Sequence, residues 1–189
     1  CMHPYPIYRQ TEAERSLEFA LAAGFGQSMV SADPVPLVAH IPFLQGQQGD
    51  EIELHLVRSN PIARLLQNIQ TPAKLSVSGP HGYISPDWYG VKDQVPTWNY
   101  VAVHLSGTLR MLKHDQLLAL LDRLSAHFEA QLAPKPAWKS SKMTPEVLQK
   151  MLRQIVPCSF KIEDIQSTCK LSQNKTDMSR LAAADAVEQ

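Results

Sequence analysis

The run Thr97-Trp-Asn-Tyr-Val-Ala-Val-His-Leu-Ser-Gly-Thr-Leu-Arg-Met-Leu112 is the longest strand signal in the chain. Alternate side chains of a strand point to opposite faces of a sheet. Val101, Val103 and Leu105 would share one face, and the residues between them are smaller or more polar. The pattern predicts a strand with one buried face, which needs further strands beside it.

Five other segments carry strand signals. They are Gln27–Ala32, Val35–Leu44, Glu51–Arg58, Ala73–Ser78 and Ser159–Ile165. These segments follow one another in blocks and do not alternate strictly with helices, which favours antiparallel pairing. We therefore expect a mainly β protein, an antiparallel barrel with peripheral helices, and not a doubly wound parallel sheet.

Helices are predicted around this barrel. Thr11 and Glu14 form a capping-box pattern ahead of an apolar stretch, so a first helix is expected over 11–24. Pro61 follows Asn60 at the first position of a second, short helix. Apolar spacing predicts two further helices, over 117–128 and 144–153.

Two stretches are predicted to be less regular. Residues 79–96 are rich in glycine and proline and read as a long loop, a kind of segment that often carries function. Residues 176–189 are polar and alanine-rich, and we expect them to form a C-terminal tail with a frayed helix. The whole chain, 1–189, is expected to be a single domain, with Cys1 interpreted as a remnant ahead of a native start at Met2.

The composition narrows the function classes. The chain has 18 Lys and Arg residues against 18 Asp and Glu residues, so its formal net charge is zero. A nucleic-acid binder usually has a basic excess, so this balance argues against DNA binding as the main activity. The sequence holds neither a long apolar run nor the pattern of a secretion signal, and we expect a cytoplasmic protein without a membrane partner.

Several kinds of catalytic and metal site are not indicated. Cys158 and Cys169 form no CxxC pair, so neither a zinc site nor a disulfide framework is expected. Walker A, GxGxxG, HExxH and G-x-S-x-G motifs are all missing from the sequence. No pair of histidines has the spacing of metal ligands beside a carboxylate, so we expect no metal site.

The first candidate cluster is His55-Leu-Val-Arg58-Ser-Asn60-Pro61, at a strand end that runs into a helix start. His55 and Arg58 lie on opposite faces while the strand lasts, so both reach one ligand only if the chain bends. Ser59 and Asn60 stand where free backbone N–H groups favour an anion such as phosphate, and Arg58 could add a bidentate contact. The alternative is a solvated Arg58 beside an N-cap Asn60.

Aromatic residues mark the second and third clusters. Gly79-Pro-His-Gly-Tyr-Ile-Ser-Pro-Asp-Trp-Tyr89 lies in the predicted loop, where its rings could stack on a planar ligand or cover the core. Pro96-Thr-Trp-Asn-Tyr100 opens the long strand, and its Thr97 and Asn99 could hydrogen-bond a polar ring edge. A half-buried hairpin would have a similar sequence pattern.

The fourth cluster, Lys170-Leu-Ser-Gln-Asn-Lys175, is polar and could equally be a surface turn.

Taken in order, these clusters resemble the PaiB family of FMN-binding proteins. The resemblance also includes Ala39-His-Ile-Pro-Phe-Leu44 and Trp138-Lys-Ser140, and it covers about residues 3–178. It implies an FMN-binding split β-barrel that is usually a homodimer, with FMN at the subunit interface. The Trp98 and Tyr100 face of the long strand is our candidate for part of that interface.

The resemblance also implies which residues contact FMN. The phosphate would lie near His55, Arg58, Ser59 and Asn60. The ring would be bordered by Tyr83, Ser85, Trp88, Tyr89, Thr97, Trp98 and Asn99, some of them from the partner subunit. The site would be closed by Lys170, Ser172, Gln173 and Asn174.

Three functions follow as expectations. The first is a dimeric flavoprotein acting as a flavin-dependent oxidoreductase, for which we identify no catalytic acid or base. The second is an FMN-linked or cofactor-free negative transcriptional regulator with DNA as a partner, because family members often carry that label. The sequence contains no helix-turn-helix pair to support it. The third is a haem-binding split barrel with His40, His55 or His104 as the axial ligand.

Overall fold

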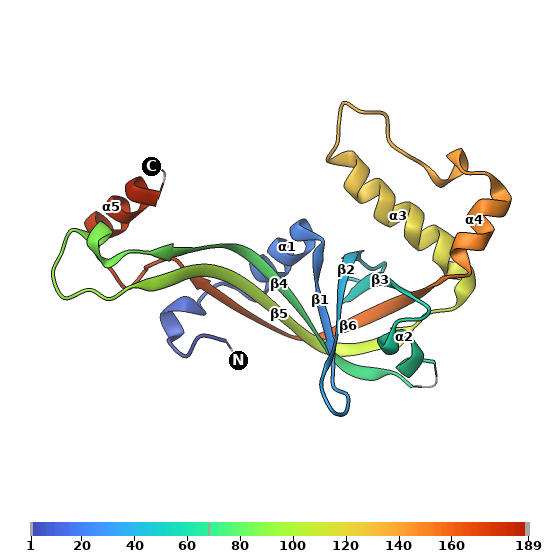
Figure 1. The fold of residues 1–189 in the computed structure, drawn as a ribbon, viewed down its shortest axis with the longest axis horizontal. Coiled ribbons are helices and arrows are strands. Elements are labelled where there is room, and N and C mark those ends of the chain that lie inside the picture. Colours follow the sequence, from blue (N-terminus) through green and yellow to red (C-terminus); the bar gives the residue numbers. More distant parts are fainter. Residues whose placement is uncertain (1, 68, 188–189) are drawn as a thin grey trace.

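Six antiparallel strands close into a barrel in the order β1-β2-β3-β6-β5-β4 (Figure 1). The structure is a computed structural model that describes residues 2–67 and 69–187. The strands are β1 (Phe25–Val30), β2 (Leu37–Gln45), β3 (Glu51–Val57), β4 (Thr71–Ile84), β5 (Thr97–Met111) and β6 (Ile155–Lys170). The prediction of an antiparallel barrel with peripheral helices is confirmed.

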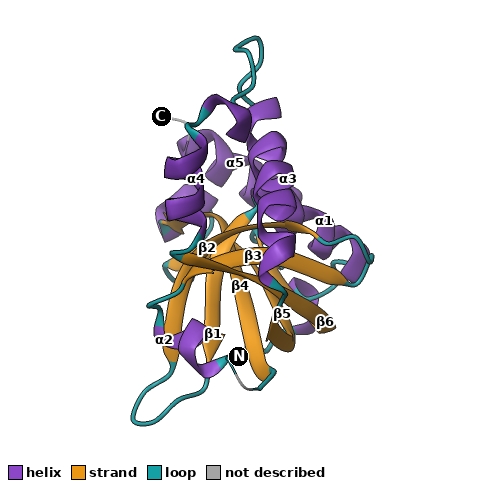
Figure 2. Cartoon of the chain, turned by 90° about the vertical axis from the view of Figure 1, so that its right-hand side faces the viewer, coloured by secondary structure: helices purple, strands orange, loops and turns teal. Residues whose placement is uncertain are grey.

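All of the helices except the last lie against this barrel, and the last lies away from it (Figure 1). The helices are α1 (Ala13–Ala23), α2 (Pro61–Leu65), α3 (Leu117–Ala130), α4 (Pro145–Leu152) and α5 (Asp177–Val187). Short 3₁₀ turns are η1 (Pro6–Tyr8), η2 (Pro86–Tyr89), η3 (His114–Gln116) and η4 (Ser140–Lys142). Figure 2 shows α3 and α4 together above the strands. An ion pair between Arg123 on α3 and the buried Glu53 on β3 joins this helical layer to the barrel.

The barrel interior is filled by the alternating apolar faces of the strands. On β3 these are Ile52, Leu54 and Leu56, and all three are almost fully buried. Val103 and Leu105 of the long strand β5 join them, as its alternation predicted. Each such side chain contributes about 1.5–3 kcal/mol when it leaves water.

The strands β4, β5 and β6 continue beyond the barrel as a three-stranded arm (Figure 1). β1 pairs with β4 only along 73–76, and β3 pairs with β6 only along 155–161. Beyond those points the three strands pair only with one another. We call the far end of this arm, residues 81–99 and 170–187, the arm tip.

The arm corrects the prediction of a loop over 79–96. Residues 79–84 continue β4 and pair with the start of β5, after a register shift between Ser78 and His81. Glycine and proline here mark an irregularity within a strand and not its end, because a bulge accommodates both residue types. The strand predicted over Ser159–Ile165 also ends too early, because residues 166–170 continue β6 by pairing with β5.

The first helix differs from its prediction at the N-terminus. α1 begins at Ala13 with Glu12 as its N-cap, and no side chain makes a capping hydrogen bond, so the capping box at Thr11 is wrong. Its end is as predicted, because Gly24 adopts the left-handed conformation with φ of 59°. α1 packs on the inner face of the arm, where Ser16 Oγ donates to Ser167 Oγ at 2.9 Å.

Candidate functional site

His55 lies on the outer face of β3, opposite Pro157 of β6. It is half-buried, and its Nδ1 atom is shielded from solvent without a hydrogen-bond partner in the described structure. Burial lowers the pKa of His55 below 6.5, which favours the neutral imidazole. A buried ring nitrogen without a partner is unusual in a structural histidine and fits a group that contacts a ligand.

Arg58 follows directly after the last residue of β3 and begins a turn, so the strict alternation of strand faces ends before it. Its Nε donates to the carbonyl of Arg153 at 2.8 Å, and one Nη donates to the carbonyl of Ile155 at 3.3 Å. A guanidinium has five N–H donors, so this anchoring leaves three of them to meet a ligand. Arg58 is therefore held in place at the junction of β3 and β6.

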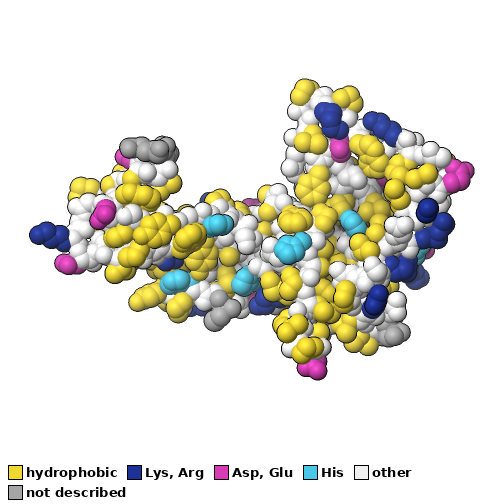
Figure 3. All heavy atoms as spheres, in the orientation of Figure 1, with side chains coloured by type: hydrophobic (Ala, Val, Ile, Leu, Met, Phe, Trp, Pro, Cys, Tyr) yellow, Lys and Arg dark blue, Asp and Glu magenta, His cyan; other side chains and the backbone are white. Residues whose placement is uncertain are grey.

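Asn60 is the N-cap of α2, and its Oδ1 accepts a hydrogen bond from Ile62 N at 2.9 Å. Pro61 follows at the first helical position, as predicted. Ser59 is exposed beside them. We call His55, Arg58, Ser59 and Asn60 the barrel-end cluster, and Figure 3 shows Lys and Arg side chains gathered on this end of the molecule.

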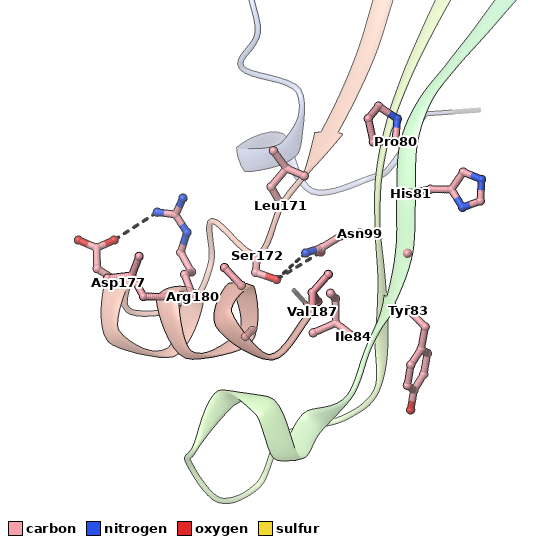
Figure 4. A pocket seen from close by; sticks show the side chains of 14 residues that line it. Pro80, His81, Tyr83, Ile84, Asn99, Leu171, Ser172, Asp177, Arg180 and Val187 are labelled. Carbon is pink, nitrogen blue, oxygen red and sulfur yellow. Dashed lines mark hydrogen bonds and ion pairs between the residues drawn. The ribbon is translucent and has the colours of Figure 1, made fainter. Parts of the chain in front are cut away.

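At the arm tip, one buried network joins three of the predicted residues. Tyr89 Oη lies 2.9 Å from Ser172 Oγ. The side-chain amide of Asn99 lies 3.2 Å from the same oxygen, a contact that Figure 4 shows. Ser172 is buried and has a φ of 62°, a conformation that is rare for a residue other than glycine. The turn after β6 is thus locked onto β5 and η2.

Lys170 ends β6 beside this network. Its Nζ donates to Thr97 Oγ1 and lies 5.9 Å from the centre of the buried Tyr8 ring. Burial lowers the pKa of Lys170 below its usual value. Tyr8 is a residue that sequence reasoning missed. The aromatic residues near the N-terminus are the only available signal for it.

The remaining predicted residues of the arm tip have separate positions. Gln173 folds back on its own turn, where its Oε1 accepts from Leu171 N at 2.7 Å and its Nε2 donates to the carbonyl of Cys169. Asn174 is exposed.

Ser85 is the N-cap of η2, and its Oγ accepts from Asp87 N at 3.4 Å. Trp88 packs partly buried beside Tyr89.

Tyr83 and Trp98 lie on the opposite face of the arm from this network. They are paired across β4 and β5, with ring centres 6.3 Å apart, and about half of each side chain is exposed. His81 stacks on Trp98 on the same face, at 6.0 Å. Figure 4 shows the His81 and Tyr83 side chains directed away from α5. Two distinct surfaces therefore meet at the arm tip.

A cleft of about 710 Å³ lies between α5 and β4 on the inner side of the arm (Figure 4). Its walls are mostly apolar and include Ile84, Leu171, Leu181 and Val187. α5 occupies the tail that the sequence predicted to fray. Over the described residues it packs on η2 through the buried Ala183.

The barrel-end cluster and the arm-tip residues are far apart within one chain. His55 is opposite Pro157, whereas Lys170 lies thirteen residues further along β6. At about 3.3 Å per residue, this separation is roughly 40 Å. The structure therefore brings the predicted residues together in two groups and does not bring the two groups together.

Neither a metal-binding cluster nor a membrane-spanning helix is found among the described residues. No group of three or more His, Cys, Asp or Glu residues within 2–67 and 69–187 could hold a metal ion. Among the helices that the structure describes, none is long and apolar enough to cross a membrane.

This fold is that of the flavin-binding split barrels. The FAD- and haem-binding protein of Mycobacterium smegmatis has the same fold, with a TM-score of 0.62 and 21% identity over 93% of this chain and 80% of its own. The flavocytochrome Anf3 of Azotobacter vinelandii matches with a TM-score of 0.58 and 16% identity over 96% of this chain and 78% of its own.

Sequence comparison defines the family. Residues 2–164 match the family described as "Putative FMN-binding domain". The protease synthase and sporulation protein PAI 2 of Bacillus subtilis is 32% identical over 172 residues, which are 90% of this chain and 81% of that protein. The chain belongs to this FMN-binding family, the PaiB family, and FMN is the cofactor that defines it.

The residues present fit this cofactor. The barrel-end cluster offers guanidinium and hydroxyl donors together with the unpartnered Nδ1 of His55, which suits a phosphate group. The arm tip offers exposed aromatic rings on one face, which suit a planar ring system. The Asn99 amide and the Lys170 ammonium lie by the network on the other face, where they donate to Ser172 and Thr97.

Proposed function

We propose that this protein is a homodimeric flavoprotein in which FMN lies between two copies of the chain. The barrel-end cluster of one copy would hold the phosphate, and the arm tip of the second copy would cover the ring. One observation carries the proposal: the two groups of residues are roughly 40 Å apart in one chain, which is further than one FMN molecule reaches. A second copy supplies the missing half of each site.

Different residues of the chain would bind different parts of FMN. Arg58 offers its free N–H donors to the phosphate from a fixed position, because the carbonyls of Arg153 and Ile155 anchor it. The neutral His55 adds a polar contact without a second charge. Tyr83 and Trp98 provide a flat apolar surface that excludes water from the ring.

The chemistry of the site belongs to the cofactor. Bound FMN supplies electron or hydride transfer, while the protein sets its orientation and electrostatic surroundings. We propose a flavin-dependent oxidoreductase, supported by the cationic Lys170 at the arm tip. An ammonium in this partly buried position would favour negative charge on a neighbouring group.

The direct test is the absorption spectrum of the purified protein after FMN is added and unbound flavin is removed. The expected result is retained flavin in the wild-type protein and weaker retention in Arg58→Ala. Arg64→Ala is the matched control, because Arg64 is exposed on the adjacent α2 and its side chain makes no hydrogen bond in the described structure. Wild-type protein that retains no flavin at high protein concentration would contradict the proposal.

Reduction of the bound flavin by NADH or NADPH then tests the oxidoreductase role.

The regulatory role is supported by one feature, a local concentration of positive charge. Arg58 precedes α2 and Arg64 lies on it, while Lys150 lies on α4 and Arg153 is its C-cap residue. Figure 3 shows Lys and Arg side chains gathered at this end of the molecule. Binding to duplex DNA would weaken steeply as salt rises, because phosphate contacts release counterions. A binding assay at two salt concentrations tests it, and no binding at low salt excludes it.

The haem alternative has support at His104. This residue lies on the outer face of β5, and its Nδ1 is buried without a partner in the described structure. Both structural neighbours described above are named for haem or cytochrome content. Haem added to the protein would give a Soret band that His104→Ala removes, whereas a flavoprotein without haem gives none.

A further inference from the structure

Two apolar surfaces stand at opposite ends of the molecule. The first is the cleft under α5, whose wall residues Leu171, Leu181 and Val187 are 46%, 66% and 56% exposed. Such large apolar side chains around a single cavity are typical of a surface that another molecule covers. The cleft lies on the arm tip, which projects away from the barrel (Figure 1).

The second surface is α4, at the far end of the barrel. Val147 and Met151 are 45% and 52% exposed and lie four residues apart, so they share one side of the helix. Only Leu152 of this helix is buried. α4 is thus an amphipathic helix with an apolar side directed away from its own chain.

The charges beside these two surfaces are of opposite net sign. Lys150 on α4 and the C-cap residue Arg153 are exposed near Met151, against one exposed carboxylate of the helix, Glu146. Asp177 and Asp185 are exposed on α5, and Asp177 lines the cleft, where it forms an exposed ion pair with Arg180 at 3.2 Å. Opposite charges at the rim of an interface steer the partners and set their register.

Arg58 connects this helix to the proposed flavin site. Its guanidinium binds the carbonyl of Arg153 at the end of α4, so the barrel-end cluster and α4 are neighbours. An arm tip that covers the barrel-end cluster of a second copy must therefore also approach that copy's α4.

We propose that α4 of each copy docks its Val147 and Met151 side into the cleft under α5 of the other copy. This inference rests on the proposed function, because the flavin site places the two ends together. One two-fold axis forms both contacts at once, so the assembly closes as a dimer and does not extend into a filament. The cleft is then a docking site for a second copy of this chain.

The first test replaces exposed residues on each surface and measures the mass of the full chain by light scattering. Met151→Asp and Ala184→Asp are expected to convert the dimer to monomer at micromolar concentration. Gln149→Asp on α4 and Ala182→Asp on α5 are the matched controls and should remain dimeric. All four positions are exposed, so the variants should fold, and circular dichroism confirms it. Dimers of unchanged stability in Met151→Asp and Ala184→Asp would overturn the inference.

The second test exchanges charges. Lys150→Glu and Asp185→Lys are each expected to raise the dimer dissociation constant by on the order of tenfold, and the double variant to recover most of that loss. Additive losses in the double variant would contradict the docking of α4 against α5.

Flavin retention separates this inference from the proposed function. A wild-type dimer that the cleft variants dissociate but that holds no FMN would support the docking and reject the flavin site. If the wild-type dimer holds FMN and the cleft variants remain dimeric, the flavin site is supported and the docking is rejected. A wild-type monomer or an open-ended polymer would overturn the docking.

Discussion

Lys170 shows how a single residue of the candidate site depends on a distant part of the chain. Its Nζ is held between Thr97 Oγ1 and the ring of Tyr8, and Tyr8 also packs edge-on against His3 at 4.7 Å. The lysine was a candidate from its sequence cluster. The tyrosine was not, because nothing in the local pattern connects residue 8 with residue 170.

We expect Tyr8→Leu to weaken FMN binding several-fold, because the ammonium group loses a cation–π contact of about 1 kcal/mol and its fixed position. Titration of FMN with the variant, followed by flavin fluorescence, measures the effect. Tyr8→Phe keeps the ring and should bind FMN like the wild type. Equal losses in both variants would show that the hydroxyl, and not the ring, matters.

Two histidines should make stability depend on pH. Burial lowers the pKa of His55 and of His104 below 6.5, so the unfolded chain binds more protons than the folded one as the pH falls through 6.5. Stability should therefore decrease on acidification from that pH down to the folded-state pKa values. Thermal unfolding of the cofactor-free protein measures it, and the His55→Gln, His104→Gln double variant should show a smaller slope.

At the scale of the elements, β5 and β6 decide the architecture. The two strands pair along 100–111 and 158–170, with one irregularity between Ser106 and Gly107. A Cβ atom added at Gly107 would lie 1.9 Å from the carbonyl oxygen of Lys161, so no larger residue fits at this crossing. Glycine here permits close approach of two backbones.

We expect Gly107→Ala to destabilise the protein by at least about 2 kcal/mol, because backbone atoms of β6 must move to admit the methyl group. Gly82→Ala is the control in the neighbouring strand, where a Cβ meets nothing within 4 Å. That variant should stay within about 0.5 kcal/mol of the wild type. Urea unfolding of both proteins makes the comparison.

The elements show what the sequence could predict. Alternation located β3 and β5 almost to the residue, because one face of each is buried in the barrel. It missed 79–84 because this part of β4 lies in the arm, where a strand is specified by its partner β5 and not by a buried face. The site residues were proposed as one pocket. Their separation onto two faces and two ends depends on strand register, which no local pattern contains.

For the molecule as a whole, binding and assembly should be coupled. If each flavin site needs both copies, dilution that dissociates the dimer also releases FMN. We expect the fraction of retained flavin to fall with protein concentration, along the same curve as the fraction of dimer. Fluorescence of released FMN and light scattering over a dilution series test this. Retention that is independent of concentration would place the whole site within one chain.

The position of β6 has a consequence for folding. This strand closes the barrel between β3 and β5, and it also carries Thr168, to which the backbone N–H of His3 donates across 165 residues. Contacts so distant in sequence form slowly, because much chain must be ordered before they are made. On the ribosome, the edges of β3 and β5 stay unpaired until residues 155–170 emerge. Once β5 has been made, the nascent chain therefore exposes two strand edges until β6 is available to cover them.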